Sequence, residues 1–405
     1  MSRPLSKILF FLCVCLAGST ALEGSTFAEI SSAADNTRLL NLLSKAYQTM
    51  DDNYYLPVSR KIYDDFLKEF PAERLLELHK KKHQVADFAQ LGAGLLVNKL
   101  KSPTDRFTSL VPSEKTKDFK ANAYAVTEDL GIEGNKIPQG FEITKVQKHS
   151  DAYQQGVRAG DWLLAINGKE TASQKEESIR AQLSPVLASI TRLRILTKTK
   201  NITQEISLES KSYFKETVSV LPSAQPGVFI LNISHFNQKT SHDFSDEIAI
   251  FTQDKIKHLI IDLRNNSGGP PLAAREILGF FLPVNDPLFA IARKKQRPVM
   301  LSSPPQPVAY HGPVTILVNQ KTGSAAEMFS GLMQAKQIAV LVGQKTAGAT
   351  YLKGLYDLGD GSTIFMITSL TYFYDRRVFP PDGIVPDTLL NDNEDSLKFA
   401  LEHLR

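Results

Sequence analysis

Length, composition and charge place the chain among ordinary globular proteins. It has 405 residues, of which 42% are hydrophobic and 22% are charged, and this length is sufficient for two or three domains. Such a composition argues against a collagenous, a disordered or a multi-spanning membrane protein. The 47 basic and 43 acidic residues give a formal net charge of +4, which is too small and too evenly spread to indicate a nucleic-acid partner.

The first residues have the three regions of a secretory signal peptide. Two basic residues, an apolar stretch from Ile8 to Ala17 and several small residues follow one another. Cleavage is expected after Ala21 or after Ala28, so residues 1–28 are assigned to the signal peptide. The mature protein is therefore expected to be periplasmic or otherwise secreted. The apolar stretch is too short to span a bilayer comfortably, although an uncleaved anchor is the alternative.

Both cysteines of the chain, Cys13 and Cys15, lie within this segment. After cleavage the protein would have no thiol and no disulfide, which excludes thiol catalysis and a cysteine-ligated metal. A metal-compatible spacing occurs at His79 and His83, but no glutamate follows the first histidine, as a zinc peptidase would need. Three lysines separate the pair, which favours a solvated basic helix face. We therefore expect no metal and no cofactor.

Residues 29–120 are predicted to form an N-terminal helical region. Apolar residues recur at helical spacing from Leu39 to Met50. A second periodic stretch runs from Leu75 to Leu100. Both patterns indicate amphipathic helices.

Residues 121–210 combine alternating β-like patterns with a characteristic string of residues. Phe141 to Val146 alternates with period two, and a short helix is expected from Ser150 to Gly156. The string Ala159 to Gly168 then offers a tight Gly-Asp turn, an apolar strand and an Asn-Gly hairpin turn. This string resembles the signature of PDZ domains.

The PDZ resemblance implies a binding site for protein C-termini. Such a domain adds a peptide strand to its sheet edge and binds the terminal carboxylate with backbone N–H groups. The loop for this carboxylate would be Leu130, Gly131 and Ile132, because PDZ domains of this kind place a similar apolar-glycine-apolar run just before the second strand. The expected partners are unfolded proteins or proteins with exposed C-termini. A PDZ fold that only braces the next domain is the alternative.

Residues 211–405 alternate apolar strands with helical stretches, which indicates an α/β core. The expected buried strands are Val228–Ser234, Leu259–Leu263, Val314–Val318 and Ala339–Val342.

Three long motifs lie in this core, and a fourth segment precedes the PDZ-like region. The motifs are Asp262–Gly269, Asn319–Glu327 and Pro380–Asp387, and the upstream segment is Thr104–Leu110. In this order they resemble the carboxyl-terminal processing peptidases, or tail-specific proteases, over roughly residues 37 to 390. The resemblance implies a PDZ-containing serine peptidase with an α+β multidomain fold. Its parts would be an α/β core of the ClpP/crotonase type, an inserted PDZ domain and the N-terminal helical region.

The resemblance makes Ser324 the catalytic serine. On a strand-to-helix turn its hydroxyl would be exposed at the carboxyl edge of the sheet, beside free N–H groups of the helix N-terminus. Gly269 and Ala325 would supply the two backbone donors of the oxyanion hole. Ser324 and Glu327 also have the spacing of a capping box, and both roles are compatible. For Gly268 and Gly269 a plain turn is the alternative.

The residue that should activate this serine is absent from its usual position. A serine hydroxyl needs a base within hydrogen-bond reach. The family has a lysine in a Thr-Phe-Gly-Lys-Gly element after the serine, and the corresponding residue here is Ala349. Lys345 is not expected to replace it, because the family commonly has a lysine there without a catalytic role.

A histidine base is not found in a family position either. A related branch places one near the first domain, and the matching residue here is Phe107. The remaining histidines of the core stand in no family motif, and we expect them at the surface or at helix caps: His235, His242 and His311.

Lys353 is the remaining candidate for the base. The family has a glutamine four residues beyond its lysine, and Lys353 occupies that place. Residues four apart on a strand face the same way, but Lys353 starts roughly 13 Å further along. Partial burial would be needed to lower its pKa toward neutrality. An exposed lysine at a sheet edge is the alternative.

Two functions remain open. The first is a secreted endopeptidase that binds C-termini through its PDZ domain and cleaves by acyl-enzyme chemistry at Ser324. The second is a pseudopeptidase that keeps the fold as a peptide-binding scaffold. The retained serine, glycines and strand–helix frame favour the first function, and Ala349 favours the second. The oligomeric state has no signature in the sequence.

Overall fold

The computed structural model describes residues 33–82, 87–252, 256–307 and 309–404. The expected signal peptide with Cys13 and Cys15 lies outside the described residues, and so does His83. No helix within the described ranges has the length and apolar character that a membrane span requires.

The N-terminal region is built from helices whose apolar faces meet. They are α2 (Ala33–Asn53), α3 (Arg60–Glu69), α4 (Ala72–Lys82) and α5 (Phe88–Leu100). Helix α5 begins after Asp87, whose carboxylate accepts the N–H groups of Ala89 and Gln90. The predicted apolar positions of α2 pack with α5 and α4 in one buried cluster, which includes Leu39, Leu43, Met50, Leu75, Leu96 and Val97. The two helical stretches expected from the sequence are therefore confirmed.

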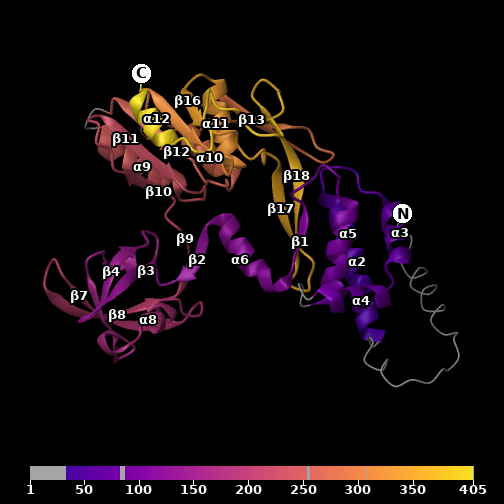
Figure 1. The fold of residues 1–405 in the computed structure, drawn as a ribbon, viewed down its shortest axis with the longest axis horizontal. Helices are drawn as coiled ribbons and strands as arrows, with labels where there is room; N and C mark the ends of the chain where they lie inside the picture. Colours follow the sequence, from indigo (N-terminus) through magenta and orange to yellow (C-terminus); the bar gives the residue numbers. More distant parts are fainter. Residues whose placement is uncertain (1–32, 83–86, 253–255, 308, 405) are drawn as a thin grey trace.

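This region also contains a strand that joins it to the end of the chain. Strand β1 (Ser109–Val111) pairs antiparallel with β18 (Thr363–Phe373). Strand β18 pairs in turn with β17 (Leu352–Asp357) and β13 (Pro287–Arg293), and β13 pairs with β14 (Val299–Ser302). In Figure 1 these strands stand between the helices and the core. The sequence pattern had indicated only helices here.

Residues that follow β1 lead into the inserted domain. Helix α6 (Ser113–Tyr124) crosses from β1 toward it in Figure 1. A two-stranded ribbon of β2 (Val126–Asp129) and β9 (Lys211–Phe214) then carries the chain in and out. Both covalent connections of the inserted domain therefore run through this ribbon.

The inserted domain is a small antiparallel sheet closed by helices. Its strands are β3 (Ile132–Ile137), β4 (Gly140–Val146), β5 (Trp162–Ile166), β6 (Lys169–Glu170), β7 (Ile190–Thr197) and β8 (Ile202–Glu209). Its helical elements are α7 (Asp151–Gln154), η1 (Thr171–Ser173) and α8 (Glu176–Leu183). Asn167 and Gly168 close the β5–β6 hairpin with φ values of 48° and 78°, as a primed hairpin turn requires.

The C-terminal core is a sheet covered by helices on both faces. Its order is β10-β11-β12-β15-β16-β19, and the strands from β11 onward are parallel. Their bounds are β10 (Val218–Leu221), β11 (Val228–Ile233), β12 (His258–Asp262), β15 (Val314–Val318), β16 (Ala339–Gly343) and β19 (Thr388–Leu389). The four predicted buried strands are thus found within a residue of their expected ends.

Alternate side chains of these strands enter two separate cores. Leu231, Ile261, Ile316 and Leu341 pack with α9 (Thr240–Thr252), α10 (Pro271–Leu278) and α11 (Ala325–Ala335). On the other face, Ile230, Ile260, Leu317 and Val342 pack against α12 (Ser396–Glu402). Burial on both faces explains the continuous apolar runs, which are typical of parallel sheets. The predicted multidomain fold with an α/β core is confirmed.

Candidate active site

The carboxyl ends of four neighbouring parallel strands bring the motif residues together. The loop after β11 holds His235, the loop after β12 holds Gly268 and Gly269, the turn after β15 holds Ser324, and residues 346–349 follow β16. Because parallel strands end at the same sheet edge, loops far apart in the sequence become neighbours there. This edge is where open α/β sheets bind their ligands.

Ser324 occupies the strand-to-helix turn that the sequence predicts. It is half-buried and directly precedes α11, and its φ of 52° and ψ of −119° are values that a residue with a side chain rarely adopts. Strained backbone of this kind persists only when surrounding contacts hold it in place.

Glu327 supplies such contacts. Its buried carboxylate accepts the Ser324 N–H at 2.8 Å, which confirms that part of the expected capping box. It also accepts the N–H groups of Gly348 and Ala349 at 2.6 and 2.7 Å and the Thr346 hydroxyl at 2.6 Å. One carboxylate therefore ties the serine turn to the loop after β16, a role that the sequence did not reveal.

Gly268 and Gly269 approach their neighbours too closely for any side chain. A Cβ on Gly268 would lie 2.6 Å from the Ser324 Cβ, and one on Gly269 would lie 2.0 Å from the Phe236 carbonyl oxygen. Their φ values of 107° and 138° also favour glycine. The Gly268 N–H donates to the Asn266 side-chain oxygen at 2.8 Å, so it is not the free N–H group that an oxyanion hole needs.

Ala349 lies beside the serine turn. A Cβ built on Gly323 would be 3.7 Å from the Ala349 Cβ. The position that holds a lysine in the processing peptidases therefore lies beside Gly323, the residue before Ser324. A methyl group there accepts no proton.

The Lys353 side chain places its amine next to Ala349. It lies at the start of β17, where the pairing register shifts between Leu352 and Lys353. Its Nζ donates to the Ala349 carbonyl oxygen at 2.9 Å and lies 4.2 Å from the centre of the Phe107 ring. The side chain thus folds back along the chain, so the amine does not extend away as a regular strand would direct it, and it is not an exposed edge lysine.

The surroundings of Lys353 favour its neutral form. Burial lowers the pKa of the Lys353 amine to about 8, although the carboxylates of Glu327 and Asp105 act in the opposite direction. An amine with this pKa is neutral in about half of the molecules at pH 8. This is the direction of pKa shift that a lysine base would need.

The segment before the PDZ-like domain packs directly against this site. Besides the contact of Phe107 with Lys353, the Arg106 guanidinium donates to the Ala347 carbonyl oxygen at 2.6 Å. Asp105 is buried and accepts the Tyr54 hydroxyl at 2.7 Å and the Phe107 N–H at 2.8 Å. The family position of a histidine base therefore does lie at the site, but it is occupied by an aromatic ring.

The other candidate bases fall into two groups. Lys345, His242 and His311 are exposed, as expected. His235 is half-buried, contrary to expectation, and its Nε2 would lie 3.0 Å from a Cβ on Gly269. Burial lowers the pKa of His235, and Nε2–H donates to the Ala123 carbonyl oxygen at 3.2 Å. This hydrogen bond places the proton on Nε2, so the ring nitrogen nearest Gly269 is a donor and not a base.

The expected PDZ ligand site is a groove of about 400 Å³ beside the loop of Leu130, Gly131 and Ile132. Leu130 is fully buried, whereas Gly131 and Ile132 line the groove together with residues of α8 and β9. The groove lies in the inserted domain and is separate from Ser324.

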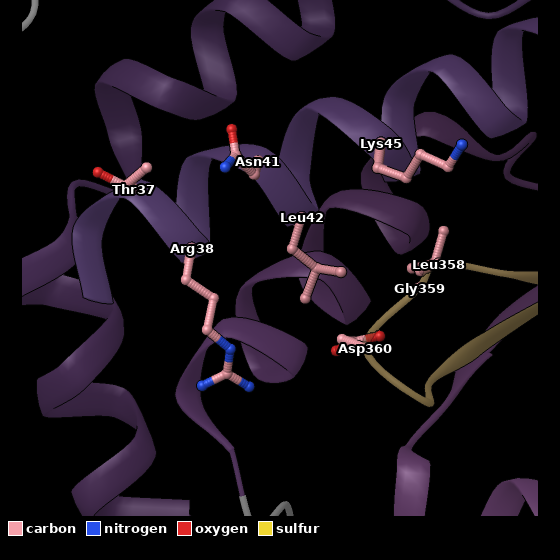
Figure 2. Close-up of a pocket in the computed structure, with 8 residues that line it drawn as sticks. All are labelled: Thr37, Arg38, Asn41, Leu42, Lys45, Leu358, Gly359 and Asp360. Atoms are coloured by element: carbon pink, nitrogen blue, oxygen red, sulfur yellow. The ribbon is translucent and has the colours of Figure 1, made fainter. Parts of the chain in front are cut away.

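Two further features carry no residue of the predicted site. A hollow of about 790 Å³ lies between α2 and the β17–β18 turn. Its lining residues include Arg38, Leu42, Lys45 and Asp360, which Figure 2 shows. On α9, ligand-type atoms of His242, Asp243 and Asp246 lie within 4.8 Å of one another. There the Lys148 amine bonds to Asp246 at 2.9 Å, so a lysine already balances the carboxylate charge.

Comparisons with known proteins agree with this geometry. Residues 227–390 match peptidase family S41, and residues 142–191 match the PDZ domain. The core of the chain is therefore similar to peptidase family S41. This family consists of serine-type peptidases, so the predicted carboxyl-terminal processing family and its enzyme class are confirmed. The matched S41 segment includes Ser324, Gly269, Ala349 and Lys353.

Curated S41 relatives extend the similarity over most of the chain. A probable CtpA-like serine protease of Staphylococcus saprophyticus is 23% identical over 89% of this chain and 67% of its own length. A carboxyl-terminal-processing protease of Synechocystis is 26% identical over 70% of this chain and 67% of its own length. The chain therefore spans about two thirds of these relatives. The solved photosystem II D1 C-terminal processing protease is similar with a TM-score of 0.48 and 19% identity, over 88% of this chain and 94% of that one.

Proposed function

We propose that this chain is a secreted endopeptidase that binds protein C-termini through its PDZ domain and cleaves at Ser324, with Lys353 as the general base. The observation that carries the proposal is the enclosed Lys353 amine, which is hydrogen-bonded to the carbonyl of Ala349 beside Ser324. The amine thus enters the site from a position four residues later than the family's lysine.

The proposed chemistry follows the acyl-enzyme route. The neutral Lys353 amine takes the proton of the Ser324 hydroxyl while the hydroxyl oxygen attacks the carbonyl carbon of the scissile peptide bond. The N–H groups of Gly269 and Ala325 stabilise the oxyanion, and each such donor contributes about 2.7–4 kcal/mol. The protonated amine then gives its proton to the leaving amine. Water, activated by the same lysine, hydrolyses the acyl-enzyme and restores Ser324.

The pH dependence of this chemistry has a defined sign. Only the neutral amine accepts the hydroxyl proton, and the pKa of Lys353 is about 8. Activity should therefore increase as the pH rises from 7 to 9, and the increase should be centred near pH 8.

A scaffold without peptidase activity is the second candidate function. Ala349 favours it, because this position beside the serine turn holds no base. The two functions differ in whether the Ser324 hydroxyl is activated, which can be measured without knowledge of the substrate.

The test uses a serine-directed fluorophosphonate probe and unfolded casein. We expect wild type to be labelled and to cleave casein, Ser324→Ala to do neither, and Lys353→Met to lose nearly all of both. Methionine keeps an apolar chain against Phe107, so the fold is retained. Lys345→Met is the matched control, because Lys345 is an exposed lysine of the same core and should leave both signals unchanged.

Two results would contradict the proposal. Full labelling of Lys353→Met would exclude this lysine as the base. An unlabelled wild type with a labelled Ala349→Lys variant would establish the scaffold function, because the serine and oxyanion hole would then lack only the base.

A further inference from the structure

The PDZ loop that should bind a peptide carboxylate already holds a carboxylate of its own chain. The Gly131 N–H donates to Asp129 Oδ1 at 2.6 Å, and the Tyr213 hydroxyl donates to the same oxygen. The other oxygen, Oδ2, accepts the Thr127 hydroxyl at 3.0 Å. Asp129 is thus bound through both oxygens where a terminal carboxylate would be expected.

A second donor of this loop is also engaged within the chain. The Leu130 N–H donates at 3.1 Å to the carbonyl oxygen of Leu183, the last residue of α8. This hydrogen bond joins the loop to the end of α8, and Leu183 lines the groove beside it. Two of the three N–H groups expected to bind a ligand are therefore occupied.

Packing holds the loop in this form. Gly131 has a φ of 74°, and a Cβ on it would lie 2.3 Å from the Ser150 Cβ. Its carbonyl accepts the Gln147 N–H at 2.8 Å, and Leu130 is fully buried. Because the backbone is constrained on several sides, the Asp129 side chain is the part that can leave.

The rest of the groove remains open. Its walls include Glu133, Arg180 and Lys215, and Arg180 donates to Glu176 and to the Gly134 carbonyl oxygen. A peptide strand therefore has space along the groove, while the site for its terminal carboxylate is filled.

We propose that Asp129 is a built-in competitor that occupies the carboxylate site of the PDZ domain, so that a peptide C-terminus binds only when the Asp129 side chain leaves Gly131. This inference rests on the proposed peptide-binding function of the domain. Two carboxylates at one N–H group repel each other, so the resting domain discriminates little between a peptide acid and its amide. Removing Asp129 restores the preference for the acid.

Displacing the Asp129 side chain would also affect the strands that connect the PDZ domain to the core. Asp129 is the last residue of β2, and Tyr213 belongs to the paired strand β9. The same hydrogen bonds therefore close the carboxylate site and join the two strands that connect the PDZ domain to the core. A ligand that displaces Asp129 also frees Tyr213 on this ribbon.

The test measures peptide binding to the full chain carrying Ser324→Ala, which prevents turnover. The probe is a fluorescein-labelled ten-residue peptide of Gly, Ser and Ala that ends in Val, used as the free acid and as the amide. Asp129→Ala should bind the acid about tenfold more tightly than the parent chain does and leave the amide unchanged. Asp129→Asn keeps an acceptor for Gly131 without the charge, so its gain for the acid should be smaller.

Glu133→Ala is the matched control, because it removes one negative charge from the same groove without freeing a loop N–H group. Its gain for the acid relative to the amide should be much smaller than that of Asp129→Ala. If Glu133→Ala gives the same acid-specific gain, general electrostatics explains the effect and the proposal is wrong. The proposal is also overturned if the parent chain already prefers the acid strongly, or if neither Asp129 variant changes the ratio of acid to amide affinity.

Fluorophosphonate labelling of chains that retain Ser324 separates this inference from the proposed function. Labelling of both wild type and Asp129→Ala without any acid-specific gain overturns only the competitor role. Binding of neither peptide by any variant overturns the competitor role and the peptide-binding function together.

Discussion

Replacing Lys353 by methionine should change the pH dependence of stability in a predictable way. The pKa of the Lys353 amine falls from an ordinary 10.5 to about 8 on folding, chiefly through burial. Between these values the unfolded chain binds more protons than the folded chain, so the stability of wild type rises with pH. Below pH 8 the folded protein must keep a buried amine protonated, which costs about 3 kcal/mol.

Methionine at this position removes that cost and keeps the contact with the Phe107 ring. Lys353→Met should therefore gain about 2 kcal/mol more unfolding free energy over wild type at pH 7 than at pH 9.5. Lys345→Met should show no such change, because Lys345 is exposed.

Urea unfolding followed by circular dichroism measures this difference. Trp162, the single tryptophan of the chain, lies in the PDZ domain, so its fluorescence serves as an internal control that should be unaffected. A difference between Lys353→Met and wild type that stays constant across this pH range would show that the amine is not buried as an ionisable group. The reasoning for Lys353 as a base would then be refuted as well.

Four further outcomes are expected from the same geometry. Ala349→Lys should increase fluorophosphonate labelling of Ser324, because its side chain is directed toward the serine turn; unchanged labelling would show that the oxyanion donors are misaligned. Glu327→Gln should destabilise the core by about 3 kcal/mol in urea unfolding and abolish labelling, since an amide NH₂ would face N–H donors in a buried site. Asp243→Asn, on α9 of the core, should weaken the hydrogen bonds and ion pairs with His149 and Lys148 on the PDZ domain by about 2 kcal/mol, measured as faster proteolysis of the β2–β9 ribbon; an unchanged cleavage rate would show that these contacts do not hold the PDZ domain against the core. Finally, N-terminal sequencing of the exported protein should begin at residue 22 or 29, whereas an intact Met1 on a cytoplasmic protein would contradict export.

The sequence predicted those parts of the fold that depend on local pattern. The parallel strands were recognisable because both of their faces are buried, which produces continuous apolar runs such as Val314–Val318. Ser324 and Gly269 were assigned because their motifs resemble those of the processing peptidases. The contacts that surround them come from segments far apart in the sequence, such as Phe236 beside Gly269.

Contacts between distant segments could not be predicted in this way. The fold-back of Lys353 depends on a register shift in β17 and on Phe107, which belongs to another part of the chain. His235 was assigned to the surface because nothing local shows that the loops after β11 and β12 meet. Asp129 likewise gives no local sign that its carboxylate binds the loop that follows it. In each case the decisive partner is supplied by tertiary packing, or by a side-chain orientation that the pattern of residue types does not encode.

The pairing of β1 with β18 has a consequence for the order in which the protein becomes active during synthesis. Phe107 is made early, Lys353 late, and the strand that joins their segments, Thr363–Phe373, is among the last parts to be translated. Until β18 has paired with β1, Lys353 has no aromatic neighbour, and its exposed amine stays protonated at neutral pH. If Lys353 is the base, as proposed, an unfinished or unfolded chain therefore carries the serine without a working base. Under the proposed export, such a chain would cross the membrane unable to digest its own unfolded copies.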